Sequence, residues 1–527
     1  SADTSNFTLN SLNGNDIAFK AKEVKAFVDF KSRKGEFTSM KGVKPCDLTY
    51  LQYVCEVDKF DWMMDTKELA LLNSNSVKSG DFPTKDIKSL LELEQPGAKF
   101  TATNPLQKNL TFNSVHPTLS LKTNKLTADE VFLVRSADAA IRPGDATLII
   151  RPGAQMDTID DATILVNTQT KIHQFYNSRV HIYSSALYSA NGYIDYVDEN
   201  NKKHPIFMSK INPDPTESRA LGNISKENAI SLSPAFLFFG NVQVDASDTN
   251  FLFDGGLQLA HNCNENLAWI KFKSRVDAKE IYIPISEAPL SVDGQRITAS
   301  MQFNPKNMEP RSAFLTTDVE RDNTFMTAKG FLTYDKASNE YRIASIEKLE
   351  DMKEALGDYL VLNKTSCDAK GQGMISLGLK KDGVVSMNNY GEIKINNNST
   401  TADLNMSLAI RFPFNQQALD FMGVELYEDM NLTQIELEAS KYQDQLVAIF
   451  GQEKGKELYE DLLITGEWKT IPKEMDYTLY FSNVRMQWDP ILNSYVSYGD
   501  VELSMVGKYQ VNKNIRAKIQ LLKTALA

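Results

Sequence analysis

Apolar and polar residues alternate along most of this chain of 527 residues. Between residues 17 and 30, apolar side chains occupy every second position, with one phase shift between Ala21 and Val24. The same period of two recurs in five further segments: 178–211, 241–262, 266–285, 340–349 and 494–522. A period of two predicts strands with one buried and one exposed face. We therefore expect a mainly β protein of stacked short strands, either a β-solenoid or β-helix or an open stack of sheets.

A different period appears once, between residues 415 and 468. Apolar residues here recur at helical spacing, beginning with Ala418, Phe421 and Met422. Pro413 fits a boundary before this segment, and the phrase "TIPKEMD" fits a return to strand after it. The sequence thus predicts a small helical insertion of two or three helices.

These patterns suggest five segments. We expect an N-terminal β segment at 1–125, a repetitive, β-helix-like segment at 126–240, a second β-rich segment at 241–412, the helical insertion at 413–468, and a C-terminal β segment at 469–527 that is incomplete.

The repetitive segment contains a short sequence repeat. Ile-Arg-Pro-Gly occurs at 141–144 and again at 150–153. Proline removes a ladder donor and glycine accepts positive φ, so each copy should end a strand and redirect the chain. Stacked units of this kind favour parallel β-helix rungs, with a stack of hairpins as the alternative.

Side-chain positions follow from this interpretation. Arg142 and Arg151 should face solvent at corresponding corners, and Asp145 and Asp161 should mark equivalent strand starts. One shared core should hold Ile141, Leu148, Ile150 and Ile164.

Charge restricts the partners. The formal net charge is -11 and the pI about 5.2, which argues against nucleic acid and against electrostatic docking on anionic lipid. No run approaches 18 apolar residues, so we predict no transmembrane helix. The polar start without a methionine fits a mature exported chain or an excerpt of a longer protein.

The sequence contains few motifs that indicate catalysis or metal binding. The carboxylates around Asp157 to Asp161 could serve sugar chemistry, but aspartates also end strands and start turns, which is the favoured interpretation. The five histidines lack metal-binding spacing, and nucleotide-binding and nucleophile motifs are absent from the sequence. We therefore predict no catalytic residue, metal or cofactor. Cys46 and Cys55 flank a strand-like run and are candidates for a local disulfide.

Tyrosines are the remaining candidates for a binding site. Four of them cluster in "YSSALYSANGYIDY": Tyr183, Tyr188, Tyr193 and Tyr196. Exposed tyrosines on a sheet stack on sugar rings or line protein interfaces, whereas buried ones pack the core. Within this stretch, Asn191-Gly192 has the composition of a hairpin turn, and residues 198–203 form a second polar turn.

The sequence of residues 136–208, with the stretch "SANGYIDYVDENNKKHPI", resembles large β-rich envelope and surface proteins of Bacteroidetes-type bacteria. Two later phrases, "CDAKGQGMISLGL" and "ADLNMSLAIRFPF", extend the resemblance. It implies export to the periplasm, the outer membrane or the cell surface, with a body of stacked strands. No functional residues are carried over, because no catalytic motif accompanies the resemblance.

We therefore expect a non-enzymatic envelope or surface protein: a scaffold, an adhesin or an accessory subunit of an outer-membrane assembly. Its partners would be other envelope proteins, with glycan or lipid as further ligands. Two alternatives stay open. One is a bridge-like lipid or glycolipid carrier with an apolar β groove, and the other is a β-helix enzyme acting on polysaccharide.

Overall fold

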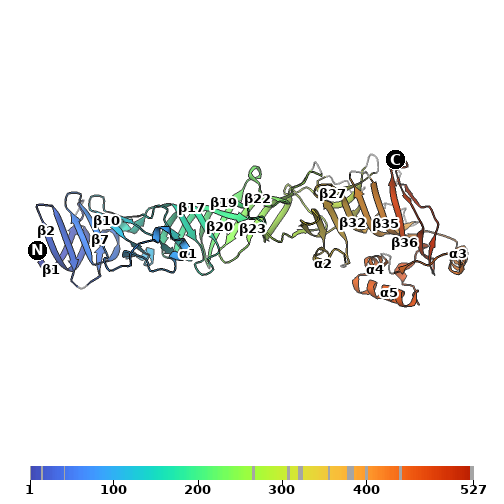
Figure 1. The fold of residues 1–527 in the computed structure, drawn as a ribbon, viewed down its shortest axis with the longest axis horizontal. Coiled ribbons are helices and arrows are strands. Elements are labelled where there is room, and N and C mark those ends of the chain that lie inside the picture. Colours follow the sequence, from blue (N-terminus) through green and yellow to red (C-terminus); the bar gives the residue numbers. More distant parts are fainter. Residues whose placement is uncertain are drawn as a thin grey trace. The chain divides into compact units, whose positions relative to one another are not determined.

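The computed structural model confirms a mainly β fold, with 54% strand and 13% helix. It describes residues 2–12, 16–40, 42–215, 217–263, 267–304, 309–317, 324–353, 356–376, 385–397, 401–437 and 442–522. The strands form open antiparallel sheets of 24, 13 and 3 strands, and over the described residues neither a closed barrel nor a solenoid is found. Of the expected architectures, the open stack of sheets is the correct one (Figure 1).

The chain divides into two compact units. Unit 1 comprises Ser1–Ile230, Phe239–Asp254 and Lys273–Lys279, and unit 2 comprises Ser231–Phe238, Gly255–Phe272 and Glu280–Ala527.

The 24-stranded sheet contains β1 to β24. Its strands are β1 Ala2–Asn10, β2 Ile17–Asp29, β3 Lys34–Ser39, β4 Lys44–Leu48, β5 Tyr53–Val57, β6 Lys59–Met63, β7 Glu68–Leu72, β8 Ala98–Ala102, β9 Thr111–Ser114, β10 His116–Ser120, β11 Lys125–Asp129, β12 Val134–Ser136, β13 Ala139–Arg142, β14 Leu148–Arg151, β15 Gln155–Met156, β16 Ile159–Leu165, β17 Gln174–Ser184, β18 Leu187–Val197, β19 Lys203–Asp214, β20 Glu217–Ile224, β21 Ile230–Ser233, β22 Phe236–Asp245, β23 Phe251–Leu259 and β24 Ile270–Val276.

The first part of unit 1 follows a regular rule. Beyond β2, two successive strands, such as β3 and β4, together make one pass of the chain across the sheet, which we call a folded strand. The two halves of each folded strand pair in two different branches of the sheet. Branch A contains β3, β6, β7, β10, β11, β14 and β15, and branch B contains β4, β5, β8, β9, β12, β13 and β16. Each such folded strand pairs with the one before it and the one after it.

The buried faces of the two branches form a filled core. Phe37 and Phe60 stack with ring centroids 4.7 Å apart in branch A, and Phe100 and Phe112 stack 5.0 Å apart in branch B. All four side chains are buried. At these positions the apolar face is packed and shielded from solvent.

Gln107 joins the two branches where their turns meet. Its side chain accepts a hydrogen bond from the Tyr53 hydroxyl at 2.9 Å and donates one to the carbonyl of Ala154. Gln107 lies in the turn η3 Pro105–Gln107 of branch B, and Ala154 in the turn η4 Pro152–Ala154 of branch A. Gln107 is buried, so both of its bonds replace water.

The repeat is a stack of hairpins, and parallel β-helix rungs are wrong for it. β13 pairs antiparallel with β16, and β14 pairs antiparallel with β11 and β15. The expected burial is confirmed for all four side chains, Ile141, Leu148, Ile150 and Ile164, and Ile141 lies opposite Ile164 in the ladder.

Two other expectations about the repeat are wrong. Arg142 does not face solvent freely, because it is half-buried and donates hydrogen bonds to the carbonyls of Pro83 and Lys85, each at 2.5 Å. Asp145 precedes β14, but Asp161 lies inside β16 with a left-handed φ of 51°, where the register to β17 shifts. It therefore marks a β-bulge rather than a strand start.

A second apolar cluster covers the outer side of branch B. The helix α1 Ile87–Leu90 and its flanks pack on Ala140 of β13 and Leu165 of β16. This explains why Ala140 and Leu165 are buried, although each lies next in the chain to a core residue of the opposite face, Ile141 or Ile164.

Unit 2 contains the 13-stranded sheet and the three-stranded sheet β27–β26–β28. Their strands are β25 Ile283–Ile285, β26 Thr298–Phe303, β27 Pro310–Thr316, β28 Thr324–Thr327, β29 Gly330–Asp335, β30 Glu340–Ala344, β31 Tyr359–Asn363, β32 Ala369–Met374, β33 Ser386–Asn388, β34 Tyr390–Asn396, β35 Thr401–Arg411, β36 Leu479–Asp489, β37 Ser494–Ser497, β38 Val501–Val506, β39 Tyr509–Ile515 and β40 Gln520–Leu522.

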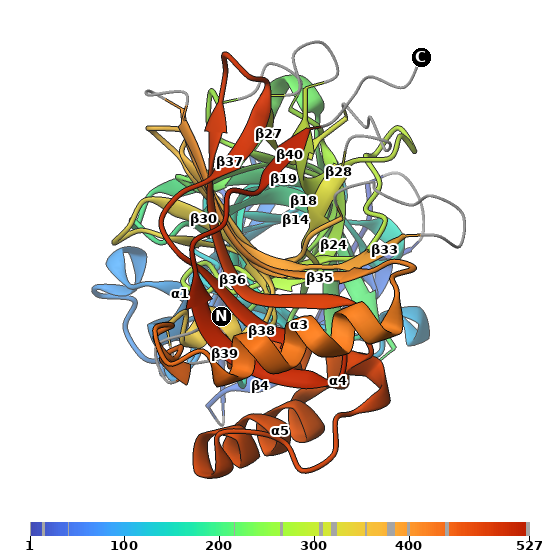
Figure 2. The same cartoon turned by 90° about the vertical axis from the view of Figure 1, so that its right-hand side faces the viewer.

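The helical insertion is confirmed. Besides the short helix α2 Ile346–Glu350, unit 2 holds α3 Gln416–Glu428, α4 Tyr442–Phe450 and α5 Gln452–Thr465. The Asn415 side chain caps α3 by accepting a bond from the Ala418 amide at 3.0 Å. Leu446 of α4 and Leu462 of α5 share a buried cluster with Tyr480 of β36, so these helices cover one face of the sheet (Figure 2).

Candidate binding face on the sheet of unit 1

The candidate site lies on the outward face of β17, β18 and β19, three long antiparallel strands joined by short turns. Along β18 the buried positions are even-numbered from Tyr188 to Tyr196, and the odd-numbered side chains point outward. The predicted turn at 198–203 is present between β18 and β19, since Asp198 Oδ1 accepts bonds from the amides of Asn200 and Lys202.

The four sequence-predicted tyrosines separate into two pairs. Tyr188 is 0% exposed and its hydroxyl lies 2.6 Å from that of Ser218, while Tyr196 is 5% exposed and packs edge-on against Phe253. Burial raises the pKa of both phenols, so both remain neutral core residues. Tyr183 and Tyr193 point outward and are 48% and 38% exposed.

Tyr193 is the centre of a row of three aromatic rings, which we call the ring row. Tyr176 of β17 and Phe207 of β19 lie directly opposite Tyr193 on its two neighbouring strands. The Tyr176 and Tyr193 rings are 6.1 Å apart with an interplanar angle of 25°, and Phe207 is 5.2 Å from Tyr193. Phe207 is 43% exposed, so the row offers an aromatic surface to solvent.

Polar groups border the ring row. The Tyr176 hydroxyl donates to Asp195 Oδ1 at 2.7 Å, and Lys203 pairs with the other oxygen of the same carboxylate at 3.2 Å. Burial and this carboxylate raise the pKa of Tyr176 to about 12, so the hydroxyl stays protonated. Arg179 and Asn191 face each other on the opposite side of Tyr193 along the strands.

A β-bulge in β17 keeps the rings aligned. Asn177 has a left-handed φ of 47°, and the register shifts between Tyr176 and Arg179. Ser178 consequently lies over Gly192, where a Cβ would approach the serine hydroxyl to 2.2 Å. Gly192 is thus needed for close strand contact in the middle of β18, and the predicted turn at Asn191-Gly192 is wrong.

A cavity of about 350 Å³ lies beside the repeat, lined by Asp145, Asp157, Asp160 and Asp161. The Arg151 guanidinium donates hydrogen bonds to both carboxylate oxygens of Asp157, at 2.6 and 2.8 Å. Arg179 pairs with Asp160 at 3.3 Å. Asp145 accepts a bond from the Thr147 amide. Three of these carboxylates are therefore engaged in hydrogen bonds or ion pairs within the protein. The described residues contain no group of acids, histidines or cysteines suited to a metal ion.

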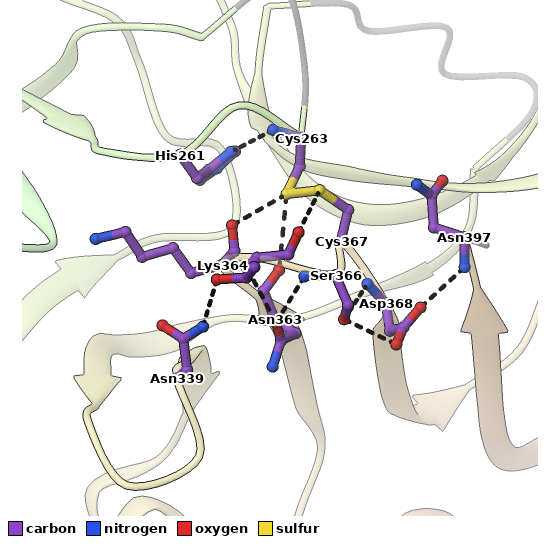
Figure 3. Close-up of a disulfide and its surroundings, with 10 residues drawn as sticks. His261, Cys263, Asn339, Asn363, Lys364, Ser366, Cys367, Asp368 and Asn397 are labelled. Atoms are coloured by element: carbon purple, nitrogen blue, oxygen red, sulfur yellow. Dashed lines mark hydrogen bonds between the residues drawn. A yellow bond between two sulfur atoms is a disulfide. The ribbon is translucent and has the colours of Figure 1, made fainter.

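The disulfide of the structure is not the one expected from the sequence. Cys263 is bonded to Cys367, 104 residues away, with Cα atoms 5.3 Å apart. Figure 3 shows it beside His261, whose Nδ1 accepts a bond from the Cys263 amide at 3.1 Å. Burial, together with the charge of Lys364, lowers the pKa of His261 to about 4, so this imidazole is neutral at pH 7.

Cys46 and Cys55 are instead buried free cysteines. They face each other on β4 and β5, as their local spacing implied. The ladder already holds these two strands together, and their thiols pack as small core groups. Cys46 and burial raise the pKa of the Cys55 thiol, which keeps it protonated.

Sequence reasoning missed Tyr176, Phe207 and Asp195. The alternation of side chains along a strand would by itself have placed Tyr193 on the opposite face of β18 from Tyr188 and Tyr196. The partners of Tyr193 depend on cross-strand register, and the bulge at Asn177 shifts that register.

Comparison with protein-family models and with curated proteins gave no match for this chain. Among the helices of the described residues, none has the length and apolar character needed to cross a membrane. The functional argument therefore rests on the geometry of the molecule.

Proposed function

We propose that this protein is a non-enzymatic envelope or surface protein of the adhesin type, and that the ring row is its contact surface for glycan. The supporting observation is the alignment of half-buried Tyr176 with exposed Tyr193 and Phe207 across three strands. Such a platform rests on backbone ladders, so it is rigid before a ligand arrives.

The chemistry at the rim favours a sugar. One face of a pyranose ring carries C–H groups that pack on an aromatic ring, while its hydroxyl edge needs hydrogen-bond donors and acceptors. Asp195, Lys203 and Asn191 lie next to the rings and offer both.

Export is part of the same proposal. The Cys263–Cys367 disulfide supports an oxidising compartment, such as the periplasm or the cell surface, where disulfides persist. Peptide mass mapping of protein isolated from its native source, with alkylation before reduction, should recover Cys263 linked to Cys367 and both Cys46 and Cys55 alkylated as thiols. Recovery of all four as thiols would argue for a reducing compartment.

Glycan binding is tested on an array of bacterial envelope and host glycans. The intact protein should bind a subset of glycans, and Tyr193→Ala should lower the affinity about tenfold or more, as expected for loss of one stacked ring. Tyr183→Ala is the control, because Tyr183 is also exposed on the same sheet, at 48% against 38% for Tyr193, but lies outside the ring row. Equal losses in both variants, or an array without bound glycans, would contradict the proposal.

A further inference from the structure

Two cavities in unit 2 share a cationic wall, which has no role in the ring row. The first, about 330 Å³, lies between the end of β35, the start of α3, residues 471–478 and Lys508. The second, about 580 Å³, lies between β33, α4 and the same residues 473–477. Arg411, Lys473 and Tyr477 line both cavities. Volumes of this size suit small organic ligands.

Positive charge exceeds negative charge around the first cavity. Arg411, Lys473 and Lys508 line it, together with the carboxylate of Asp476, and Lys508 also pairs with Asp420 at 3.3 Å. This excess occurs in a chain whose formal net charge is -11, so it is a local departure from the average surface. Among the described residues that line the second cavity, Glu474 is the one acidic side chain, and it pairs with Lys454 at 3.7 Å.

Arg411 is held in place by other groups. Its Nε donates to the carbonyl of Asp476 at 2.6 Å, and its guanidinium lies 5.5 Å from the centre of the Tyr477 ring. The Asp476 carboxylate is 3.7 Å away and largely exposed to water. Because one nitrogen and one face are engaged, the remaining guanidinium donors are pre-positioned for an anion.

Two polar groups at the shared wall have unused hydrogen-bonding capacity. The Tyr477 hydroxyl accepts a bond from the Asn388 side chain at 2.8 Å, but among the described residues its own hydrogen has no acceptor. Tyr477 is 5% exposed, so this donor is withheld from bulk water. Lys473 is exposed, and its ammonium has no ion-pair partner within the described part of the chain.

Beside the polar side chains of Gln416 and Thr478, the first cavity has apolar lining residues. Phe412 and Phe414 contribute rings 5.8 Å apart and nearly perpendicular, and Ile471 and Pro472 also line the cavity. Phe414 is 52% exposed, although it is a large aromatic residue beside a cavity. The cavity therefore combines an anion-binding wall with an aromatic lining.

From this combination we propose that the two cavities form a binding site for a small organic anion: a carboxylate or a phosphate joined to an aromatic ring. The anionic group binds Arg411, Lys473 and the Tyr477 hydroxyl, and the ring packs between Phe412, Phe414 and Pro472. The site is independent of the ring row of unit 1.

Isothermal titration calorimetry of the intact protein tests this with four probes: benzoate, phenyl phosphate, inorganic phosphate and phenol. At least one aryl anion should bind at a single site and more tightly than inorganic phosphate or phenol, and its affinity should fall as salt is raised. The comparison of benzoate with phenyl phosphate identifies the anionic group. Failure of both aryl anions to bind, or equal affinity for inorganic phosphate, would overturn the proposal.

Variants locate the binding event. Lys473→Met and Tyr477→Phe should each weaken binding of the aryl anion about tenfold. Lys454→Met is the control, because Lys454 pairs with Glu474 but does not line either cavity. Lys473 is exposed, so its variant keeps the fold even where Tyr477→Phe is destabilising. Unchanged affinity in Lys473→Met, or an equal loss in Lys454→Met, would place the anion elsewhere.

Discussion

The two copies of Ile-Arg-Pro-Gly are identical in sequence and different in structure. The first, at 141–144, lies in the middle of a folded strand, where the chain leaves β13 in branch B and continues as β14 in branch A. The second, at 150–153, lies at the reversal between β14 and β15, which pair with each other. One tetrapeptide thus bends a strand in one place and reverses the chain in the other.

The two glycines are required for different reasons. Gly144 has ordinary backbone angles, but a Cβ there would lie 2.6 Å from the carbonyl oxygen of Asp161. Gly153 has a left-handed φ of 74° and open space around it. Glycine serves close approach in the first copy and backbone freedom in the second, so a shared motif does not imply a shared role.

The sharpest test of this comparison is the same substitution in both copies, beginning with Gly144→Ala. The methyl group would collide with backbone, which cannot move without disturbing the β13–β16 ladder. We expect a loss of about 3 kcal/mol in the free energy of unfolding, measured by urea denaturation followed by circular dichroism. A loss no larger than that of Gly153→Ala would remove the distinction between the two glycines.

Arg142→Met should have the next largest effect. It keeps the aliphatic stem but removes both donors to the carbonyls of Pro83 and Lys85, which anchor the segment before α1. Hydrogen bonds from charged donors suggest a loss of about 2 kcal/mol. Hydrogen exchange should rise in residues 82–91 more than elsewhere in unit 1, and uniform exchange would show that Arg142 has no anchoring role.

Gly153→Ala should cost about 1 kcal/mol, because a methyl group disfavours left-handed φ while meeting no neighbouring atom. Gly153→Asn is the matching control, since asparagine tolerates this conformation better than alanine does. If the two variants were equally stable in urea, steric rather than conformational cost would be acting there.

Arg151→Met should have the smallest effect of the four, within the error of a denaturation curve. Arg151 is about half exposed and pairs with Asp157 at the surface, where water competes for both groups. A loss comparable to that of Arg142→Met would show that the two arginines are equivalent after all, as their sequence context suggests.

Period-two alternation was enough to predict the mainly β fold and the buried side chains of the repeat, because burial of one face follows directly from strand geometry. Ile141 and Ile164 lie opposite each other in the ladder, as a shared core requires. The choice between parallel rungs and hairpins could not be made, because Pro-Gly breaks occur in both and the pairing partner of each half-strand is set by tertiary structure.

The candidate binding face was predicted in part. Tyr193 is in the ring row, but its contacts come from Tyr176 and Phe207, whose positions depend on one bulge. The disulfide was beyond local reasoning, since Cys263 and Cys367 are brought together by folding over 104 residues, whereas the nearer pair was already held by hydrogen bonds.

The neighbour-to-neighbour pairing of the folded strands has a kinetic consequence. Up to β16, each new pass finds its ladder partner in the pass just completed, so ladder formation needs no distant strand. Such a chain can add strands in order from its N-terminal end while later residues are still unfolded, because no ladder needs a partner beyond the pass just completed. Gln107 meets the Ala154 carbonyl only after several further passes, and this late contact locks a stack that has already formed.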